Sequence, residues 1–228
     1  MDTANILYTA SIWVLPAVFA ITLHEAAHGF VAWRLGDDTA YRQGRVTFNP
    51  LRHIDPVGTI LVPALLLLSG VRFLFGWAKP VPVNFSRLRH PKRDMIWVAA
   101  AGPGINLALA FFSALALHAS ALLPDTVGQW ADANLVNSVQ LNVMLAVFNM
   151  LPIPPLDGGR VLVGILPRPL ARPLAGLERI GLFIILGGLF ILPWLGQKLG
   201  LDLNFFDWLV GEPATFLLRL IVGLTGIE

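Results

Sequence analysis

Apolar residues are gathered into six long stretches, and polar residues, prolines and glycines fill the connections between them. The stretches cover residues 5–34, 57–76, 95–123, 135–151, 178–196 and 205–225. Each is near the roughly 20 residues that a helix needs to cross the hydrocarbon core of a bilayer. In the connections, GRVTFNP and KPVPVNF alternate apolar and polar residues, which is typical of short extended pieces. The pattern predicts an all-α multi-pass membrane protein with five to six transmembrane segments and short re-entrant or β-like pieces.

Composition supports the same class. Of the 228 residues, 56% are hydrophobic and 13% are charged, whereas soluble domains carry roughly 25% charged residues. The basic residues lie in short loops between apolar stretches, which argues against nucleic-acid binding. The chain has no cysteine, so disulfides and thiolate metal ligands are excluded. We expect a single integral membrane domain over residues 1–228, with a core at about 5–166 and C-terminal helices at about 178–226.

The first apolar stretch carries the pentapeptide HEAAH at residues 24–28. His24 and His28 are four residues apart, so they lie on one face of a helix and both imidazoles can reach one ion. Zinc suits such a nitrogen ligand set, and it lowers the pKa of a bound water toward about 7. Glu25 is rotated by about 100° and can take a proton from that water without being a ligand. An ionisable residue in an apolar segment costs about 2.5–3.5 kcal/mol, which indicates a function.

Catalytic zinc usually has three protein ligands, so a third is expected. The candidates are His53, His90, His118, Asp55 and Asp157. Asp157 is favoured because three prolines break an apolar helix just before it, in FNMLPIPPLDGGRVLV. Non-helical backbone at membrane depth is tolerated where it lines a cavity or is buried in protein. The alternative is that Asp157 caps a short helix beginning near Gly158, and the two roles are compatible.

Three motifs in order, HEAAH, AGPGIN and NMLPIPPLDG, resemble the site-2 protease family of intramembrane zinc metalloproteases. The resemblance covers roughly residues 10–166. It implies one Zn²⁺ per chain, with Glu25 as the catalytic base, and makes the region of about 5–166 the catalytic core. The implied zinc ligands are His24, His28 and Asp157.

The resemblance also implies roles for two asparagines. Asn106 and Asn149 match the family's asparagines in GPxxN and NxxP, which are thought to hold substrate or stabilise the oxyanion. The chain is similar to a minimal bacterial member, without the PDZ and CBS domains that some members carry. The residues AAAGPG, which open the third stretch, should let helices approach as closely as a shared metal requires.

The expected function is zinc-dependent cleavage of transmembrane segments of other membrane proteins. Expected partners are therefore substrate helices and the lipid bilayer. One alternative is a metal-ion transporter, in which the same residues bind a transiting ion. Another is a catalytically inactive relative that binds membrane helices.

Two features predict the topology. If HEAAH and Asp157 bind one ion, the first and fourth stretches run parallel, so one of the two stretches between them does not cross. If 57–76 dips in and returns, the basic residues of connections 36–56, 77–94 and 152–177 share one face, and Lys198 lies on the other. By the positive-inside rule, that face is cytoplasmic. We expect five crossings in the cell membrane and an active site open toward the cytoplasm; six crossings is the alternative.

Residues 76–85, GWAKPVPVNF, are predicted to be extended. One hypothesis is that they pair with an unwound substrate as an added strand. The alternative is that their prolines merely block pairing at an edge.

Overall fold

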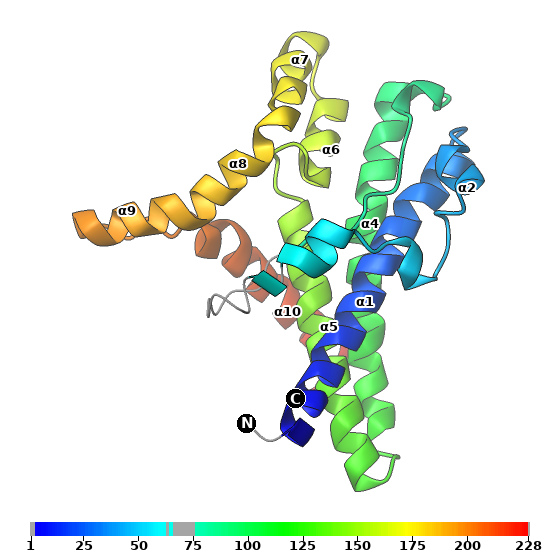
Figure 1. Cartoon of the computed structure of the whole chain (residues 1–228), viewed down its shortest axis with the longest axis vertical. Coiled ribbons are helices and arrows are strands. Elements are labelled where there is room, and N and C mark those ends of the chain that lie inside the picture. The colour runs from blue at the N-terminus through cyan, green and yellow to red at the C-terminus, as the bar shows by residue number, and fades with distance from the viewer. Residues whose placement is uncertain (1–2, 63, 66–75, 228) are drawn as a thin grey trace.

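The computed structural model describes residues 3–62, 64–65 and 76–227, and this part of the chain is helical without strands. Three long helices form the central bundle: α1 (Thr3–Arg34), α4 (Pro91–Ser120) and α5 (Asp125–Asn149). All three pack against one another, and α1 and α5 run parallel while α4 runs the opposite way (Figure 1). The expected all-α class is confirmed, and so is the parallel course of the first and fourth apolar stretches.

Shorter elements complete the chain. Between α1 and α4 lie α2 (Thr39–Arg42), η1 (Pro50–Arg52), η2 (Pro56–Leu61) and η3 (Phe85–Arg87). After α5 come α6 (Asp157–Ile165), α7 (Arg168–Gly176), η4 (Leu177–Arg179), α8 (Gly181–Leu186), η5 (Gly187–Ile191), α9 (Leu192–Leu199), η6 (Asp207–Gly211) and α10 (Glu212–Thr225). The run α8–η5–α9 projects away from the bundle, and α10 returns to it (Figure 1).

The connection between α1 and α4 leaves and rejoins the bundle at the same end. The N–H of Arg89 donates to the carbonyl of Leu35 at 3.0 Å, and the N–H of Asn84 donates to Asp37 at 2.6 Å. This return makes no net crossing, as the re-entrant hypothesis for 57–76 requires. Half of that stretch, residues 66–75, lies outside the described residues, so its own path stays a prediction.

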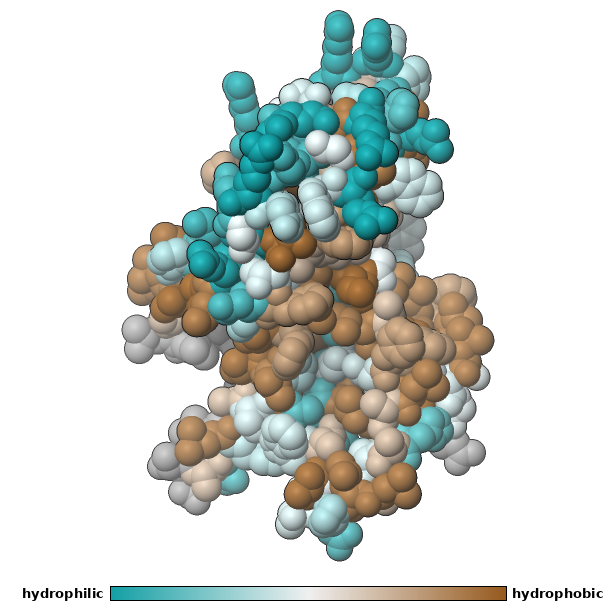
Figure 2. Space-filling model, turned by 90° about the vertical axis from the view of Figure 1, so that its right-hand side faces the viewer, coloured by the Kyte–Doolittle hydropathy of each residue, from teal (hydrophilic) through white to brown (hydrophobic). Residues whose placement is uncertain are grey.

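Four helices in the described part are long and apolar enough to cross a membrane: Leu7–Arg34, Pro91–Ser120, Gly181–Leu199 and Asp207–Thr225. The fourth predicted segment lies in α5, which is 25 residues long but carries buried asparagines that lower its hydropathy. Polar side chains gather at the end where α1 ends and α4 begins, and an apolar region follows below them (Figure 2). Of the stretch 76–85 that was predicted to be extended, residues 76–84 are neither helical nor paired in a ladder, and Phe85 begins η3.

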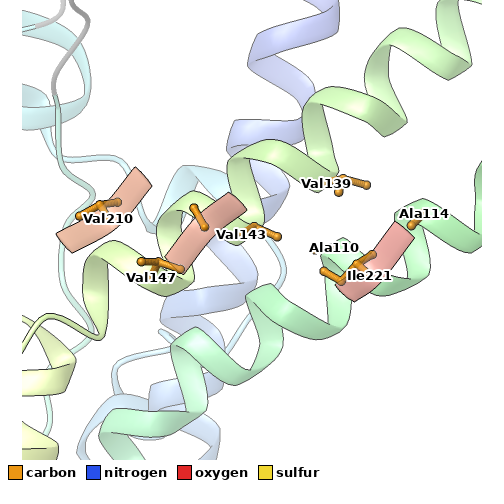
Figure 3. Packing of buried hydrophobic residues seen from close by; sticks show 8 residues of the cluster. Ala110, Ala114, Val139, Val143, Val147, Val210 and Ile221 are labelled. Carbon is orange, nitrogen blue, oxygen red and sulfur yellow. The ribbon is translucent and has the colours of Figure 1, made fainter. Parts of the chain in front are cut away.

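Small and branched residues make up the largest buried cluster. Ala110 and Ala114 of α4 are fully buried against the valines of α5, among them Val143 (Figure 3). Alanine lets two helix backbones approach closely, which favours dispersion contacts where the hydrophobic effect between helices is weak. Val210 and Ile221 bring η6 and α10 onto the same cluster. This cluster holds α4, which packs against both α1 and α6, firmly on α5.

Candidate metal centre

The two histidines of HEAAH lie side by side in α1. Their rings meet edge to face, and their Nε2 atoms are 3.0 Å apart. Both side chains are buried, with 8% of His24 and 9% of His28 exposed. The helical spacing therefore places both imidazoles on one face, as predicted.

Asp157 completes a triangle with them. Its Oδ2 lies 3.3 Å from Nε2 of His24 and 3.3 Å from Nε2 of His28. Four tetrahedral ligands with bonds of about 2.0–2.1 Å lie about 3.3–3.4 Å from one another. The two edges to Asp157 have this length, and the 3.0 Å edge between the histidines is somewhat shorter. The N-cap of α6 is Leu156, and Asp157 is the first residue of the helix. Asp157 is therefore not the N-cap of α6, and its position fits the predicted ligand role, which stays a prediction.

The hydrogen bonds of the outer ring nitrogens determine what faces the triangle. Nδ1 of His28 lies 2.7 Å from the carbonyl oxygen of Val98, which can only accept, so this nitrogen carries the proton. Nδ1 of His24 donates to Oδ1 of Asn106 at 2.5 Å. In the neutral imidazoles both Nε2 atoms then present a lone pair to the triangle, and Oδ2 of Asp157 is buried without a hydrogen-bond partner. Three converging lone pairs repel one another unless a cation lies between them.

Asn106 is held by two further contacts. Its Nδ2 donates to the carbonyl of Ala20 at 3.3 Å and to Oδ1 of Asn142 at 2.7 Å, which directs Oδ1 toward His24. The residue is fully buried. Such a partner orients a ligating imidazole and fixes its tautomer. The predicted contact of Asn106 with substrate stays a prediction, while its contact with His24 was not foreseen.

Asn149 lies at the end of α5, away from this network. Its Nδ2 donates to the carbonyl of Leu145 in its own helix at 2.9 Å. Among the described residues, no hydrogen bond joins Asn149 to His24, His28 or Asp157. The role in substrate binding that the resemblance implies for Asn149 stays a prediction.

Glycines bring three segments close enough to form the site. A Cβ on Gly158 would lie 2.1 Å from the carbonyl oxygen of Met150, and one on Gly159 would lie 2.2 Å from the nitrogen of Pro154. These two glycines let α6 pack on the proline-containing break, which directs Asp157 at α1. A Cβ on Gly102 of α4 would lie 2.4 Å from Nε2 of His28 and 2.6 Å from Nε2 of His24. The bare backbone of α4 therefore forms one wall of the candidate metal site.

Glu25 is half-buried beside the triangle. Its Oε2 accepts the backbone N–H of Val81 at 2.7 Å. Arg45 is buried nearby, and burial lowers the pKa of its guanidinium while the negative charge of Glu25 counteracts that shift. Only His24, His28 and Asp157 form a group of potential metal ligands within the described ranges. Glu25 is thus outside this group, and its role as the base stays a prediction.

Comparison with known proteins agrees with this geometry. Residues 125–191 match the model of peptidase family M50. YwhC of Bacillus subtilis is 39% identical over 184 residues, which cover 79% of this chain and 80% of YwhC. Rip2 of Mycobacterium tuberculosis is 34% identical over 212 residues, covering 90% of this chain and 78% of Rip2. MJ0611 of Methanocaldococcus jannaschii is 30% identical over 184 residues, covering 78% of this chain and 88% of MJ0611.

The name of each of these three relatives describes it as an inferred zinc metalloprotease. No solved structure matches the chain significantly. Similarity of this extent over most of the length of each relative shows common descent. The chain belongs to peptidase family M50, the site-2 proteases.

Proposed function

We propose that the protein is an intramembrane endopeptidase that cleaves transmembrane segments of other membrane proteins. The observation that carries the proposal is the place of the ligand triangle. His24, His28 and Asp157 are buried where α1, α4 and α6 meet, and α1 and α4 are helices apolar enough to span a bilayer. A substrate peptide bond must therefore pass between membrane-spanning helices to reach this triangle.

The three ligands would hold a zinc ion that polarises the scissile carbonyl and acidifies water. Glu25, anchored through Oε2, takes a proton from the attacking water at its other oxygen, Oε1, and later gives it to the leaving amine. Asn106 keeps His24 in the tautomer that presents Nε2. Asn149, at the end of the helix before the proline break, is proposed to hold the substrate or the oxyanion.

Cleavage of peptides in a bilayer tests the proposal. The protein is reconstituted in nanodiscs with fluorescence-quenched peptides, each carrying the apolar span of a different single-pass protein. We expect cleavage of some peptides, loss of at least 90% of it with a zinc chelator, and recovery when zinc but not magnesium is added. Cleavage of soluble unfolded protein with no cleavage of any apolar span would contradict the intramembrane assignment.

We also propose that the protein lies in the cell membrane with its site open to the cytoplasm, because the basic connections share that face. The chain lacks cysteine, so single cysteines report topology without background. Leu122 is 86% exposed between α4 and α5, and Phe48 is 76% exposed between α1 and α4. A membrane-impermeant maleimide should label Leu122→Cys in intact cells and label Phe48→Cys after permeabilisation alone. The opposite pattern would reverse the orientation.

A further inference from the structure

Residues 79–84, which we call the strap, run beside the end of α1 that carries Glu25. The N–H of Lys79 donates to the carbonyl of His53 at 2.9 Å. The carbonyl of Lys79 accepts from Nη2 of Arg45 at 2.6 Å. These two bonds hold the start of the strap against the connection that follows α1.

The middle of the strap offers a single backbone donor. Pro80 and Pro82 have no N–H, so Val81 carries the one donor of this tripeptide, and that donor is used by Oε2 of Glu25. The side chain of Val81 is 8% exposed and lies over Gly29, one helical turn beyond Glu25. A Cβ on Gly29 would already be 3.0 Å from Cγ1 of Val81. The strap therefore rests directly on α1 where the base projects.

The other end of the strap is held by Asp37, which is fully buried. Its Oδ2 accepts the N–H of Asn84 at 2.6 Å. Its Oδ1 accepts the N–H of Thr39 at 3.1 Å and also the Thr39 hydroxyl. Within the described chain, no basic side chain forms an ion pair with Asp37. Burying a carboxylate without a counter-charge costs free energy of folding. This cost indicates that the hydrogen bonds of Asp37 to the backbone serve a function.

We propose that Asp37 is a positioning residue for the reaction proposed above. It fixes the strap at Asn84, and the strap fixes Oε2 of Glu25 through the N–H of Val81. Oε1 of Glu25 is thereby left in place to move the proton. The inference rests on the proposed function, since it assigns a task to Glu25.

This arrangement differs from the hypothesis that the segment 76–85 pairs with substrate. A pairing strand needs free N–H groups, and Val81 has already given its own to Glu25. Val83 donates no hydrogen bond to any residue that the structure describes, so within 80–83 it has the donor that a substrate could use. The two roles therefore depend on different residues of the strap.

The first test replaces Asp37 by asparagine, which keeps the shape of the side chain. The new side chain has one neutral acceptor oxygen in place of two charged ones, so the N–H groups of Thr39 and Asn84 compete for it and the bond to the strap is weakened. We expect kcat on the quenched nanodisc peptides to fall about 10- to 100-fold, because small displacements of a catalytic group cost that much. KM should stay within about twofold, with zinc per chain unchanged. Hydrogen–deuterium exchange of a peptide spanning the strap should become faster.

The control is Asp38→Asn. Asp38 is the next residue and of the same type, but it pairs with Arg42 at 2.6 Å and Arg87 at 3.0 Å, both of which are largely exposed. This variant should leave kcat, KM and strap exchange unchanged.

A second pair tests the strap itself. Val81→Pro removes the N–H that Glu25 accepts, and Val83→Pro removes one that Glu25 does not use. We expect kcat to fall in Val81→Pro and to stay within about twofold in Val83→Pro. A rise in KM with unchanged kcat, in Val83→Pro or in Asp37→Asn, would assign the strap to substrate pairing and overturn the proposal.

Two further outcomes overturn it. If Asp37→Asn loses its zinc or its fold together with activity, Asp37 is structural and not a positioning residue. If strap exchange is unchanged in Asp37→Asn while the wild type cleaves the peptides, Asp37 does not control the strap. A zinc-loaded wild type that cleaves no peptide contradicts the proposed function instead, and the exchange measurement then still decides whether Asp37 holds the strap.

Discussion

Replacing Glu25 by glutamine should abolish peptide cleavage and leave zinc bound. Glutamine keeps the shape of the side chain and an oxygen that can accept the N–H of Val81, but it cannot take a proton. General acid–base catalysis contributes about 100- to 10,000-fold, so the rate in nanodiscs should fall by that range. Zinc per chain should stay at about one, because the ligand triangle does not include Glu25.

The control for this variant is Glu178→Gln. Glu178 is an exposed glutamate that pairs with Arg160 at 3.1 Å, so its loss should change cleavage less than twofold. A Glu25→Gln variant that cleaves within tenfold of the wild type would contradict the assignment of Glu25 as the base. One that loses zinc would contradict its place outside the ligand set.

The same variant separates the two rival functions. In a metal-ion transporter, ion flux should survive Glu25→Gln, since the residues that bind the ion are intact. In an inactive helix-binding relative, the wild type itself would cleave nothing while still retaining membrane helices. In the proposed protease, the variant binds substrate but does not release product, so membrane proteins that co-purify with it are candidate substrates.

The part of the site that could be predicted from sequence is the part set by helical periodicity. His24 and His28 lie on one face of any helix that contains them, and Glu25 lies about 100° away. Asp157 could be proposed because prolines break the helix before it, but the choice between ligand and cap remained open. That choice depends on where the packing of α6 on α4 brings Asp157 relative to α1, which no local pattern reports.

Contacts between distant segments account for what was missed. Asn106 could be noticed as part of a motif, yet its bond to His24 spans 82 residues of sequence and follows from the packing of α4 on α1. The hydrogen bond between Val81 and Glu25 spans 56 residues of sequence and involves a backbone N–H. Every residue except proline has such a group, so the sequence does not indicate its partner. The small residues of AAAGPG predicted close packing, but not which glycine meets the imidazoles.

The fold was predictable to a similar degree. Long apolar stretches indicated the spanning helices, and the need for two parallel helices indicated that the connection before α4 returns to its own side. The apolar stretch 135–151 predicted the segment that lies in α5, although α5 is not among the helices apolar enough to span, because Asn134, Asn137 and Asn142 lower its hydropathy. Asn142 donates to Ser138 within α5 and accepts from Asn106 of α4, so its polar side chain is hydrogen-bonded inside the bundle. A polar helix can therefore occupy a membrane bundle when its neighbours satisfy its side chains.

Replacing Gly102 by alanine should empty the metal site. The added Cβ would lie 2.4 Å from Nε2 of His28 and 2.6 Å from Nε2 of His24, well inside van der Waals contact. Zinc tolerates ligand distances within about 0.2 Å, so rings pushed apart by more than that cannot close on the ion. We expect zinc per chain, measured by atomic spectroscopy after purification, to fall from about one to below about 0.2. Cleavage should fall at least 100-fold.

Gly104→Ala is the matched control, because it lies two residues further along the same helix. A Cβ on Gly104 would meet no heavy atom within 4 Å. Alanine favours a helix over glycine by about 1 kcal/mol at both positions, so both variants gain the same local preference. Gly104→Ala should keep its zinc and cleave within twofold of the wild type. If Gly102→Ala also keeps zinc and activity, α4 does not form the wall of the site, and the close contact between its backbone and the two imidazoles has no part in binding the metal.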